Sequence, residues 1–242
     1  MRLSRVFVAT PLESGARVTL AGDAAAHVTR VLRLGPGAPL TLFNGTGGEY
    51  SGTIEAARAG AVTVTVGAPQ RIERESPLRV TLAQGVARGE RMDLVVQKAT
   101  ELGVSRIVPV FTARSVVKLD GPKAARRLEH WRAIAIGACE QSGRNRPPQV
   151  TSPVTLEELL RAEQTGMRLV LSPGAALRLP QIPRPEGGAL VLIGPEGGLA
   201  EEEQQRALAA GFVGVRIGPR VLRTETAAIA ALVLLQREFG DL

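Results

Sequence analysis

From residue 78 onward, short apolar runs alternate with amphipathic stretches, and this alternation limits the fold more than any other feature of the chain. Short apolar runs bounded by turn residues are typical of buried strands, and apolar residues at helical spacing are typical of helices. Strands joined through helices form a parallel sheet with helices on both faces. The sequence therefore predicts an α/β domain over residues 78–242. The expected strands are residues 78–83, 106–111, 168–171, 189–193 and 214–217, and the expected helices are residues 90–102, 123–142, 156–162, 201–210 and 224–238.

The first seventy residues follow another pattern, with short strands and a single helix. Residues 61–66 alternate with a period of two, which is typical of a half-buried strand. Asp23 is the expected N-cap of a helix that runs through Leu32. Together with further expected strands at residues 6–9, 17–20, 39–43 and 50–56, this predicts a small β-barrel over residues 1–70. Residues 71–77, which are polar and end at a proline, are the expected linker.

The composition is that of an ordinary globular protein, with 44% hydrophobic and 22% charged residues. The longest apolar run, residues 226–235, is too short to span a bilayer, and the N-terminus does not resemble a secretory signal. We therefore expect a cytoplasmic protein that does not bind membranes. The chain has one cysteine, Cys139, and two histidines, so no disulfide, zinc site or other metal is expected.

Positive charge is concentrated in the middle of the chain. The net charge is +7, and residues 71–146 carry 15 Arg and Lys against 8 Asp and Glu. Basic side chains bind phosphates and release counterions, which favours a nucleic-acid partner. The alternative is a solubilising surface in a chain with 27 Arg and 3 Lys. Charge by itself does not decide between the two.

Three expected strands end in turns that could hold a ligand, because ligands of parallel α/β sheets bind at the carboxyl ends of the strands. One turn follows Leu171 and begins with Ser172, and another follows Ile217 and leads to Thr224, the expected N-cap of the last helix. The turn after Ile217 and the turn at residues 194–198 are called the two glycine-bearing turns below. Neither of them matches a nucleotide phosphate-binding pattern. The third turn is a run of five residues: Gly194, Pro195, Glu196, Gly197 and Gly198. Its glycines permit close approach of a ligand, and its acidic surroundings favour a neutral or cationic one.

The run at residues 194–198, paired with residues 217–227, resembles the binding signature for S-adenosylmethionine (SAM) of the SPOUT class of trefoil-knotted RNA methyltransferases. Other runs resemble the RsmE family more closely, and they are collinear over nearly the whole chain. They are His-Val-Thr-Arg-Val-Leu-Arg at residues 27–33, Phe-Asn-Gly at 43–45, Gln-Lys-Ala-Thr-Glu-Leu-Gly at 97–103 and Glu-Gln-Ser-Gly-Arg at 140–144.

The resemblance implies a PUA-like barrel that binds RNA, followed by a SPOUT knotted domain over residues 78–242. It implies a homodimer that uses SAM to methylate N3 of one uridine in 16S ribosomal RNA of the small subunit. The residues expected to contact SAM are Leu171, Ser172, Gly194, Pro195, Glu196, Gly197, Ile217, Gly218, Leu222 and Arg223.

Uridine N3 carries a proton, so the reaction needs a base or a cation that stabilises the uracil anion. No histidine falls in the candidate turns, which leaves arginine and glutamate. We expect Arg144 or Arg223 to stabilise the developing charge, and Glu196 or Glu225 to assist positioning or proton removal. Each arginine can instead bind phosphate or lie on the surface.

His27, Arg30 and Arg33 lie three residues apart and are expected to share one face of the barrel helix. We predict that this face contacts RNA, and the alternative is a solvated face with His27 partly buried. Two other functions compete with the main prediction. One is a knotted methyltransferase that acts on a ribose 2′-hydroxyl, and the other is an RNA-binding protein without catalytic activity.

Overall fold

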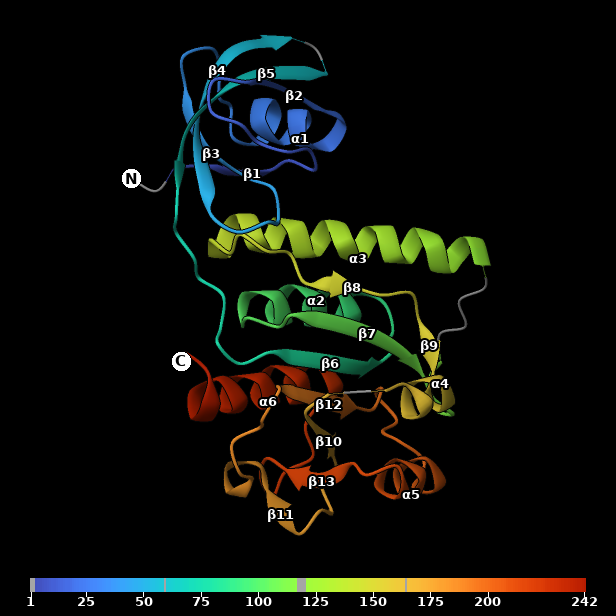
Figure 1. Ribbon diagram of the computed structural model, residues 1–242. Coiled ribbons are helices and arrows are strands. Elements are labelled where there is room, and N and C mark those ends of the chain that lie inside the picture. The colour runs from blue at the N-terminus through green and yellow to red at the C-terminus, as the bar shows by residue number, and fades with distance from the viewer. Residues whose placement is uncertain (1–2, 59, 117–120, 164) are drawn as a thin grey trace. The chain divides into compact units, whose positions relative to one another are not determined.

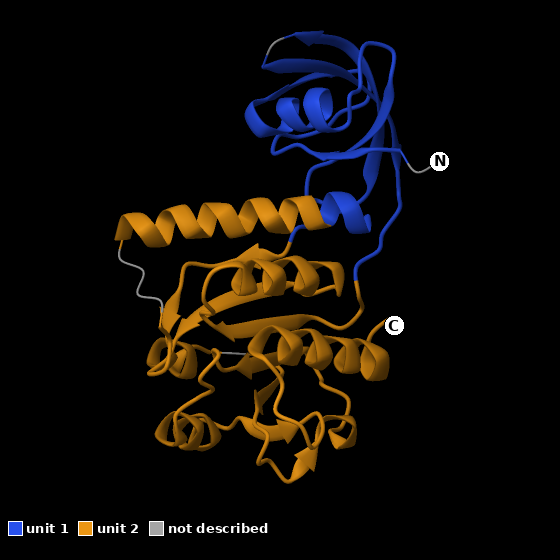
Figure 2. Ribbon diagram, turned by 180° about the vertical axis from the view of Figure 1, so that it is seen from behind, with its two compact units in different colours: residues 1–75, 139–147 blue, residues 76–138, 148–242 orange. Residues whose placement is uncertain are grey.

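The computed structural model describes residues 3–58, 60–116, 121–163 and 165–242. The chain forms two compact units (Figure 2). The first contains residues 1–75 and, from much later in the chain, residues 139–147, whereas the second contains residues 76–138 and 148–242. Each unit has its own hydrophobic core. No pattern in the sequence indicates that residues 139–147 join the first unit.

The first unit is built on a five-stranded sheet (Figure 1). Val62, Val64 and Val66 are buried and the two threonines between them are half-buried, which confirms the expected alternation. One pair of strands, β1 and β3, is parallel, and the other neighbours are antiparallel. Across the sheet the order is β1 (Arg5–Phe7), β3 (Pro39–Phe43), β4 (Glu49–Arg58), β5 (Ala61–Gln70) and β2 (Arg17–Ala21).

The helix of the first unit begins earlier than expected. In α1 (Gly22–Ala26) the N-cap position is occupied by Ala21, so the prediction that Asp23 is the N-cap is wrong. Strand β2 runs up to Ala21, and Gly22 turns the chain into the helix with a φ of 56°. Asp23 therefore lies in the first turn, where its carboxylate meets the positive end of the helix dipole.

A π-helix, η1 (His27–Val31), follows α1 and changes where the basic side chains lie. The Leu32 amide donates to the His27 carbonyl oxygen at 2.9 Å, which closes the wider turn. Arg33 lies beyond the helix with a φ of 53°, which is uncommon for a residue other than glycine. The expected shared α-helical face is therefore wrong. Arg30 and Arg33 are exposed, and His27 is half-buried.

Residues 139–147 are held in the first unit by buried polar contacts. Arg5, which is 6% exposed, forms an ion pair with Glu49 in β4. The same guanidinium donates to Asn145 Oδ1 at 2.5 Å. The Phe7 amide donates to a carboxylate oxygen of Glu140 at 3.0 Å. Strand β1 is thus joined to a segment more than 130 residues later in the chain.

The expected linker is hydrogen-bonded to the same late segment. Asn145 Nδ2 donates to the Ile72 carbonyl oxygen at 2.7 Å, and Arg144 forms an ion pair with Glu75. Arg144 is 4% exposed, so this pair is largely shielded from water. Residues 72–75 are therefore fastened to the first unit by contacts that their polar composition does not reveal.

The second unit contains one parallel sheet, as expected. All five expected strands are present. Three further strands have only two residues each, which is too short for a period to be visible in the sequence. Across the sheet the order is β11 (Leu177–Arg178), β13 (Val213–Arg216), β10 (Met167–Leu171), β12 (Ala189–Ile193), β6 (Val80–Gly85), β7 (Arg106–Phe111) and β8 (Gln149–Val150), and β9 (Val154–Thr155) also pairs with β7.

Helices cover both faces of this sheet, which confirms the expected layers. On one face the core includes Trp131 and Leu232, and on the other it includes Leu156 and Phe212. The first face packs against α2 (Glu90–Glu101), α3 (Gly121–Ser142), the 3-10 helix η2 (Leu179–Gln181) and α6 (Thr224–Phe239), and the second against α4 (Leu156–Arg161) and α5 (Glu201–Ala209). Within the described parts of the chain, no helix has the length and apolar character that a bilayer crossing requires.

The strand order brings three of the predicted turns to one edge of the sheet. β13, β10 and β12 are parallel neighbours, so their carboxyl ends lie side by side. β12 also pairs with β6, which ends at Gly85. The trefoil knot implied by the resemblance stays a prediction, because strand order does not by itself establish it.

Candidate active site

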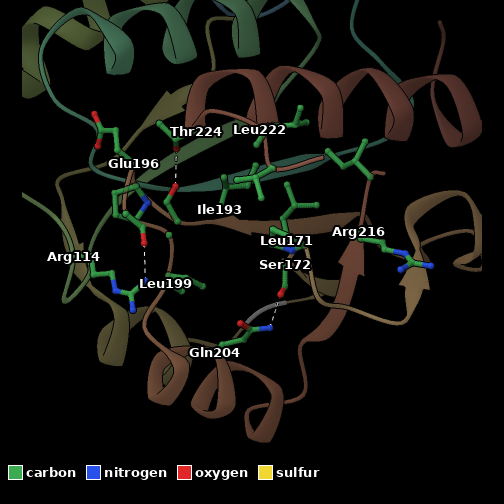
Figure 3. A pocket seen from close by; sticks show the side chains of 18 of the residues that line it. Arg114, Leu171, Ser172, Ile193, Glu196, Leu199, Gln204, Arg216, Leu222 and Thr224 are labelled. Atoms are coloured by element: carbon green, nitrogen blue, oxygen red, sulfur yellow. Dashed lines mark hydrogen bonds between the residues drawn. The ribbon is translucent and has the colours of Figure 1, made fainter. Parts of the chain in front are cut away.

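A cavity of about 330 Å³ opens at this edge, where β10, β12 and β13 end (Figure 3). It is also lined by Arg114, Leu199 and Thr224. Arg223, the tenth residue expected at SAM, is exposed and lies outside the described lining. The structure thus brings together nine of the ten expected residues: Leu171, Ser172, Gly194, Pro195, Glu196, Gly197, Ile217, Gly218 and Leu222.

Close backbone packing shapes the turn after β12. A Cβ atom on Gly194 would lie 2.7 Å from both Gly198 C and Leu199 N, closer than real Cβ contacts allow. A Cβ on Gly85 would lie 2.5 Å from Pro195 N. The turn therefore folds tightly on itself and against the end of β6, because neither glycine carries a side chain.

Thr224 joins the two glycine-bearing turns, as Figure 3 shows. Its hydroxyl donates to the Gly194 carbonyl oxygen at 2.7 Å and accepts from Gln84 Nε2 at 2.8 Å. The prediction that Thr224 is the N-cap of α6 is wrong, because Arg223 takes that position. Thr224 is instead the first residue of α6. Its hydroxyl therefore does not cap the helix and is available to the turn at Gly194.

Glu196 is held by the beginning of α2. Its Oε1 accepts from the Arg88 amide at 2.8 Å and from Arg91 Nη1 at 3.0 Å. Burial raises the pKa of Glu196, but the Arg88 amide and the Arg91 guanidinium lower it by more, so the pKa lies below its ordinary value. In Figure 3 the carboxylate points away from the middle of the cavity. Glu196 is thus an anion that anchors the turn, and a weak proton acceptor.

A second glutamate, Glu203 in α5, joins two backbone segments next to the cavity wall. It is 3% exposed, and its two oxygens accept from the Ala113 amide at 2.7 Å and from the Ala200 amide at 2.9 Å. Next to Ala113, Arg114 donates through Nη1 to the Gly197 carbonyl oxygen at 2.8 Å. Neither residue is among those predicted from the sequence. The rule that ligands bind at strand ends, applied to β7 as well, would have indicated Arg114.

The remaining expected catalytic residues do not line the described cavity. Arg144 lies in the first unit, paired with Glu75, while Arg223 and Glu225 lie at the beginning of α6. Glu225 Oε2 is buried and has no hydrogen-bond partner among the described residues. Its side chain is half-buried.

Neither a metal nor a reactive thiol is indicated by the described residues. They contain no group of three or more His, Cys, Asp or Glu that could hold a metal ion. Burial raises the pKa of Cys139 to about 12, so this residue stays a protonated thiol. Cys139 is fully buried and acts as a small core residue.

Comparison with known proteins identifies the family. Family models match twice: "RNA methyltransferase PUA domain" over residues 20–67 and "RNA methyltransferase domain" over residues 74–236. Ribosomal RNA small subunit methyltransferase E of Bacillus subtilis (strain 168) is 33% identical over 91% of this chain and 90% of its own length. The chain belongs to the RsmE family. The Buchnera aphidicola (subsp. Schizaphis graminum) member is 31% identical over 100% of this chain and 98% of its own.

Solved structures agree with this assignment to the RsmE family. The Neisseria gonorrhoeae ribosomal RNA small subunit methyltransferase E, bound to SAM, has a TM-score of 0.93 and 37% identity over the whole of both chains. A Legionella pneumophila protein solved with the bound cofactor SAM has a TM-score of 0.97 and 41% identity, again over both whole chains. The expected order of a PUA-like unit and an α/β methyltransferase unit is confirmed.

Proposed function

We propose that this protein transfers a methyl group from SAM to N3 of one uridine in 16S ribosomal RNA. The observation that carries the proposal is the cavity at which the two glycine-bearing turns meet the end of β10. The relatives named as small-subunit methyltransferases support the choice of acceptor, and the two solved with SAM support the choice of donor.

The residues at the cavity fit SAM. Leu171, Ile193, Leu199 and Leu222 provide apolar walls for a purine ring. Gly218 also lines the cavity, and a Cβ atom there would meet no atom within 4 Å, so the backbone at this point is open to a ligand. A volume of about 330 Å³ lies within the range of small-molecule sites. We propose that the nine expected residues on the cavity wall contact SAM.

When bound, SAM supplies a methyl carbon attached to a positively charged sulfur. Uridine N3 is a poor nucleophile until its proton leaves, so the site must favour the uracil anion. The described lining contains no histidine, and Glu196 is already bonded to Arg88 and Arg91. We therefore assign Glu196 the role of a positioning residue that fastens the turn after β12 to α2.

Glu196→Gln should raise the KM for SAM about 5- to 10-fold and leave kcat within about threefold, because glutamine keeps one acceptor but loses the charge that binds Arg91. Steady-state kinetics check this. Glu157→Gln, which removes a similar exposed pair with Arg206 and changes no residue of the described lining, is the control. A kcat reduced by two orders of magnitude at unchanged KM would instead identify Glu196 as the base.

For the first unit, we propose that His27, Arg30 and Arg33 contact RNA. Log affinity falls as log salt rises. The double substitution Arg30→Ala and Arg33→Ala should make this fall less steep by about two, one for each lost phosphate contact. Filter binding to small-subunit RNA at several salt concentrations measures this. The double substitution Arg17→Ala and Arg58→Ala removes the same charge from exposed strand positions of this unit. Equal slopes for both pairs would show that Arg30 and Arg33 are merely solvated.

We also propose that the protein is a homodimer, that its second unit contains the trefoil knot, and that it acts in the cytoplasm. These proposals rest on the RsmE resemblance and on the ribosomal substrate of the named relatives. Light scattering of the purified protein tests the dimer.

Mass spectrometry of 16S ribosomal RNA from cells that lack the protein tests the function. We expect the loss of one N3-methyluridine and its return when the gene is restored. A missing ribose methyl, recognised by its nuclease-resistant linkage, would support the 2′-O-methyltransferase instead. A non-catalytic RNA-binding protein would lack SAM-dependent stabilisation, which amounts to about 2.7 kcal/mol at 100 times the dissociation constant.

A further inference from the structure

We propose that Arg114 is the catalytic residue that stabilises the uracil anion during methyl transfer. This inference rests on the proposed function. It names the residue that makes loss of the N3 proton favourable. Arg114 follows β7, whereas the expected SAM contacts follow β10, β12 and β13. It therefore adds to the cavity a cation that belongs to none of the three turns.

The Arg114 side chain lies across the glycine-bearing turn. Its Nη1 donates to the Gly197 carbonyl oxygen at 2.8 Å. A Cβ atom on Gly197 would lie 3.1 Å from Arg114 Cβ and 3.3 Å from its Cδ, so the missing side chain at Gly197 makes room for the arginine. Figure 3 shows Arg114 beside the cavity, next to Leu199.

The backbone that carries Arg114 is held on both sides. Ser115 Oγ lies 3.1 Å from the Thr112 amide nitrogen, which donates to it, and the Ser115 amide donates back to the Thr112 carbonyl oxygen at 3.0 Å. The buried Glu203 carboxylate binds the Ala113 amide and, through its other oxygen, the Ala200 amide. The backbone of Arg114 is thus held before substrate arrives, and the bond to Gly197 orients its exposed guanidinium, which favours electrostatic stabilisation.

Arg114 keeps donors for a substrate. Among the described residues its one hydrogen bond uses Nη1, and a guanidinium has five N–H donors. Arg216 and Arg220 also line the cavity, but no bond to the described residues fixes either guanidinium. Figure 3 shows the Arg216 side chain directed away from the cavity. Arg114 is therefore the preorganised cation of the site.

The chemistry balances without another protein group. The N3 proton leaves to solvent hydroxide, and the negative charge spreads over N3, O2 and O4. The Arg114 guanidinium donates to O2 or O4 and stabilises that anion. The N3 lone pair forms a bond with the methyl carbon while the bond from that carbon to sulfur breaks, and the electron pair of the broken bond stays on sulfur. The products are N3-methyluridine and neutral S-adenosylhomocysteine.

Kinetics of Arg114→Ala and Arg114→Lys on small-subunit RNA test the proposal. For Arg114→Ala we expect kcat to fall about 10²- to 10³-fold, the range for loss of one donor to a developing anion. SAM affinity by calorimetry should fall at most about 10-fold, as for loss of the Glu196 anchor of the same turn, so kcat falls much further than affinity. Arg114→Lys should recover part of the rate. Arg161→Ala, which removes an exposed arginine at the end of α4, is the charge-matched control and should behave as the unsubstituted protein.

A change in the substrate separates this role from a structural one. RNA with 5-fluorouridine at the target position has a more acidic N3, so it should recover much of the rate lost in Arg114→Ala. The rate of this variant on ordinary RNA should also keep rising with pH where that of the unsubstituted protein has levelled off. A raised KM for SAM at unchanged kcat, or no recovery with 5-fluorouridine, would overturn the proposal. Failure of the unsubstituted protein to methylate uridine N3 would instead refute the proposed function.

Discussion

Gly194→Ala should weaken SAM binding by at least about 100-fold, equivalent to about 2.8 kcal/mol. The added methyl group would lie 2.7 Å from backbone atoms of Gly198 and Leu199, and backbone cannot rotate away as a flexible side chain can. The turn after β12 must open to accept it. Opening also pulls the Gly194 carbonyl oxygen from the Thr224 hydroxyl, which joins the two glycine-bearing turns.

Titration calorimetry with SAM measures the effect. Gly174→Ala is the matched control, because Gly174 follows β10 at the same edge of the sheet and a Cβ there meets no atom within 4 Å. Circular dichroism should show equal folding of both variants. Normal SAM affinity in Gly194→Ala would contradict the assignment of the turn to the binding site.

The second large effect is expected in the first unit. Glu49→Gln should lower the stability of the first unit by about 3–5 kcal/mol, the usual cost of removing one member of a buried ion pair. The substitution keeps the shape of the side chain but leaves Arg5 buried without its anion. Arg74, whose Nη1 lies 3.2 Å from Glu49 Oε2, also loses this anion and keeps its bond to the Gly143 carbonyl oxygen.

Hydrogen exchange, followed by mass spectrometry of peptides from β1 and β3, reports this loss separately from the second unit. Glu55→Gln is the control, because Glu55 pairs with Arg17 on the exposed side of the same sheet. We expect little change in that variant. Equal protection in Glu49→Gln and Glu55→Gln would show that the buried pair does not stabilise the barrel.

The same pair predicts how stability depends on pH. Burial raises the pKa of Glu49, but hydrogen bonds and charges from Arg5 and Arg74 lower it by more, so the folded pKa lies below the ordinary value of 4.5. A lowered pKa means that the stabilisation is complete above pH 4.5 and is lost as the pH falls through the folded pKa. Glu49→Gln should therefore lack this part of the acid destabilisation.

The layers and most of the cavity wall could be predicted because they depend on local patterns. Strand and helix periods are visible in the sequence, and strand ends of a parallel sheet meet at one edge whatever the strand order. For this reason the turns that begin at Ser172, Gly194 and Gly218 could be placed together without knowledge of the topology.

The missed residues depend on contacts between distant parts of the chain. Glu203 has the sequence context of an ordinary acidic helix start, yet its carboxylate binds the Ala113 amide, 90 residues earlier. Arg144 was expected near the uracil, but Glu75 occupies its guanidinium in the first unit. The N-caps lie two residues before Asp23 and one residue before Thr224, because cap preferences do not show where the preceding segment ends.

The membership of residues 139–147 in the first unit has a consequence for the history of the two parts. The chain passes from one unit to the other three times, so neither unit corresponds to a single stretch of coding sequence. A fragment that stopped at Glu75 would lack Asn145 for Arg5 and Glu140 for the Phe7 amide. Gene fusion or exchange at one boundary would therefore deliver an incomplete first unit.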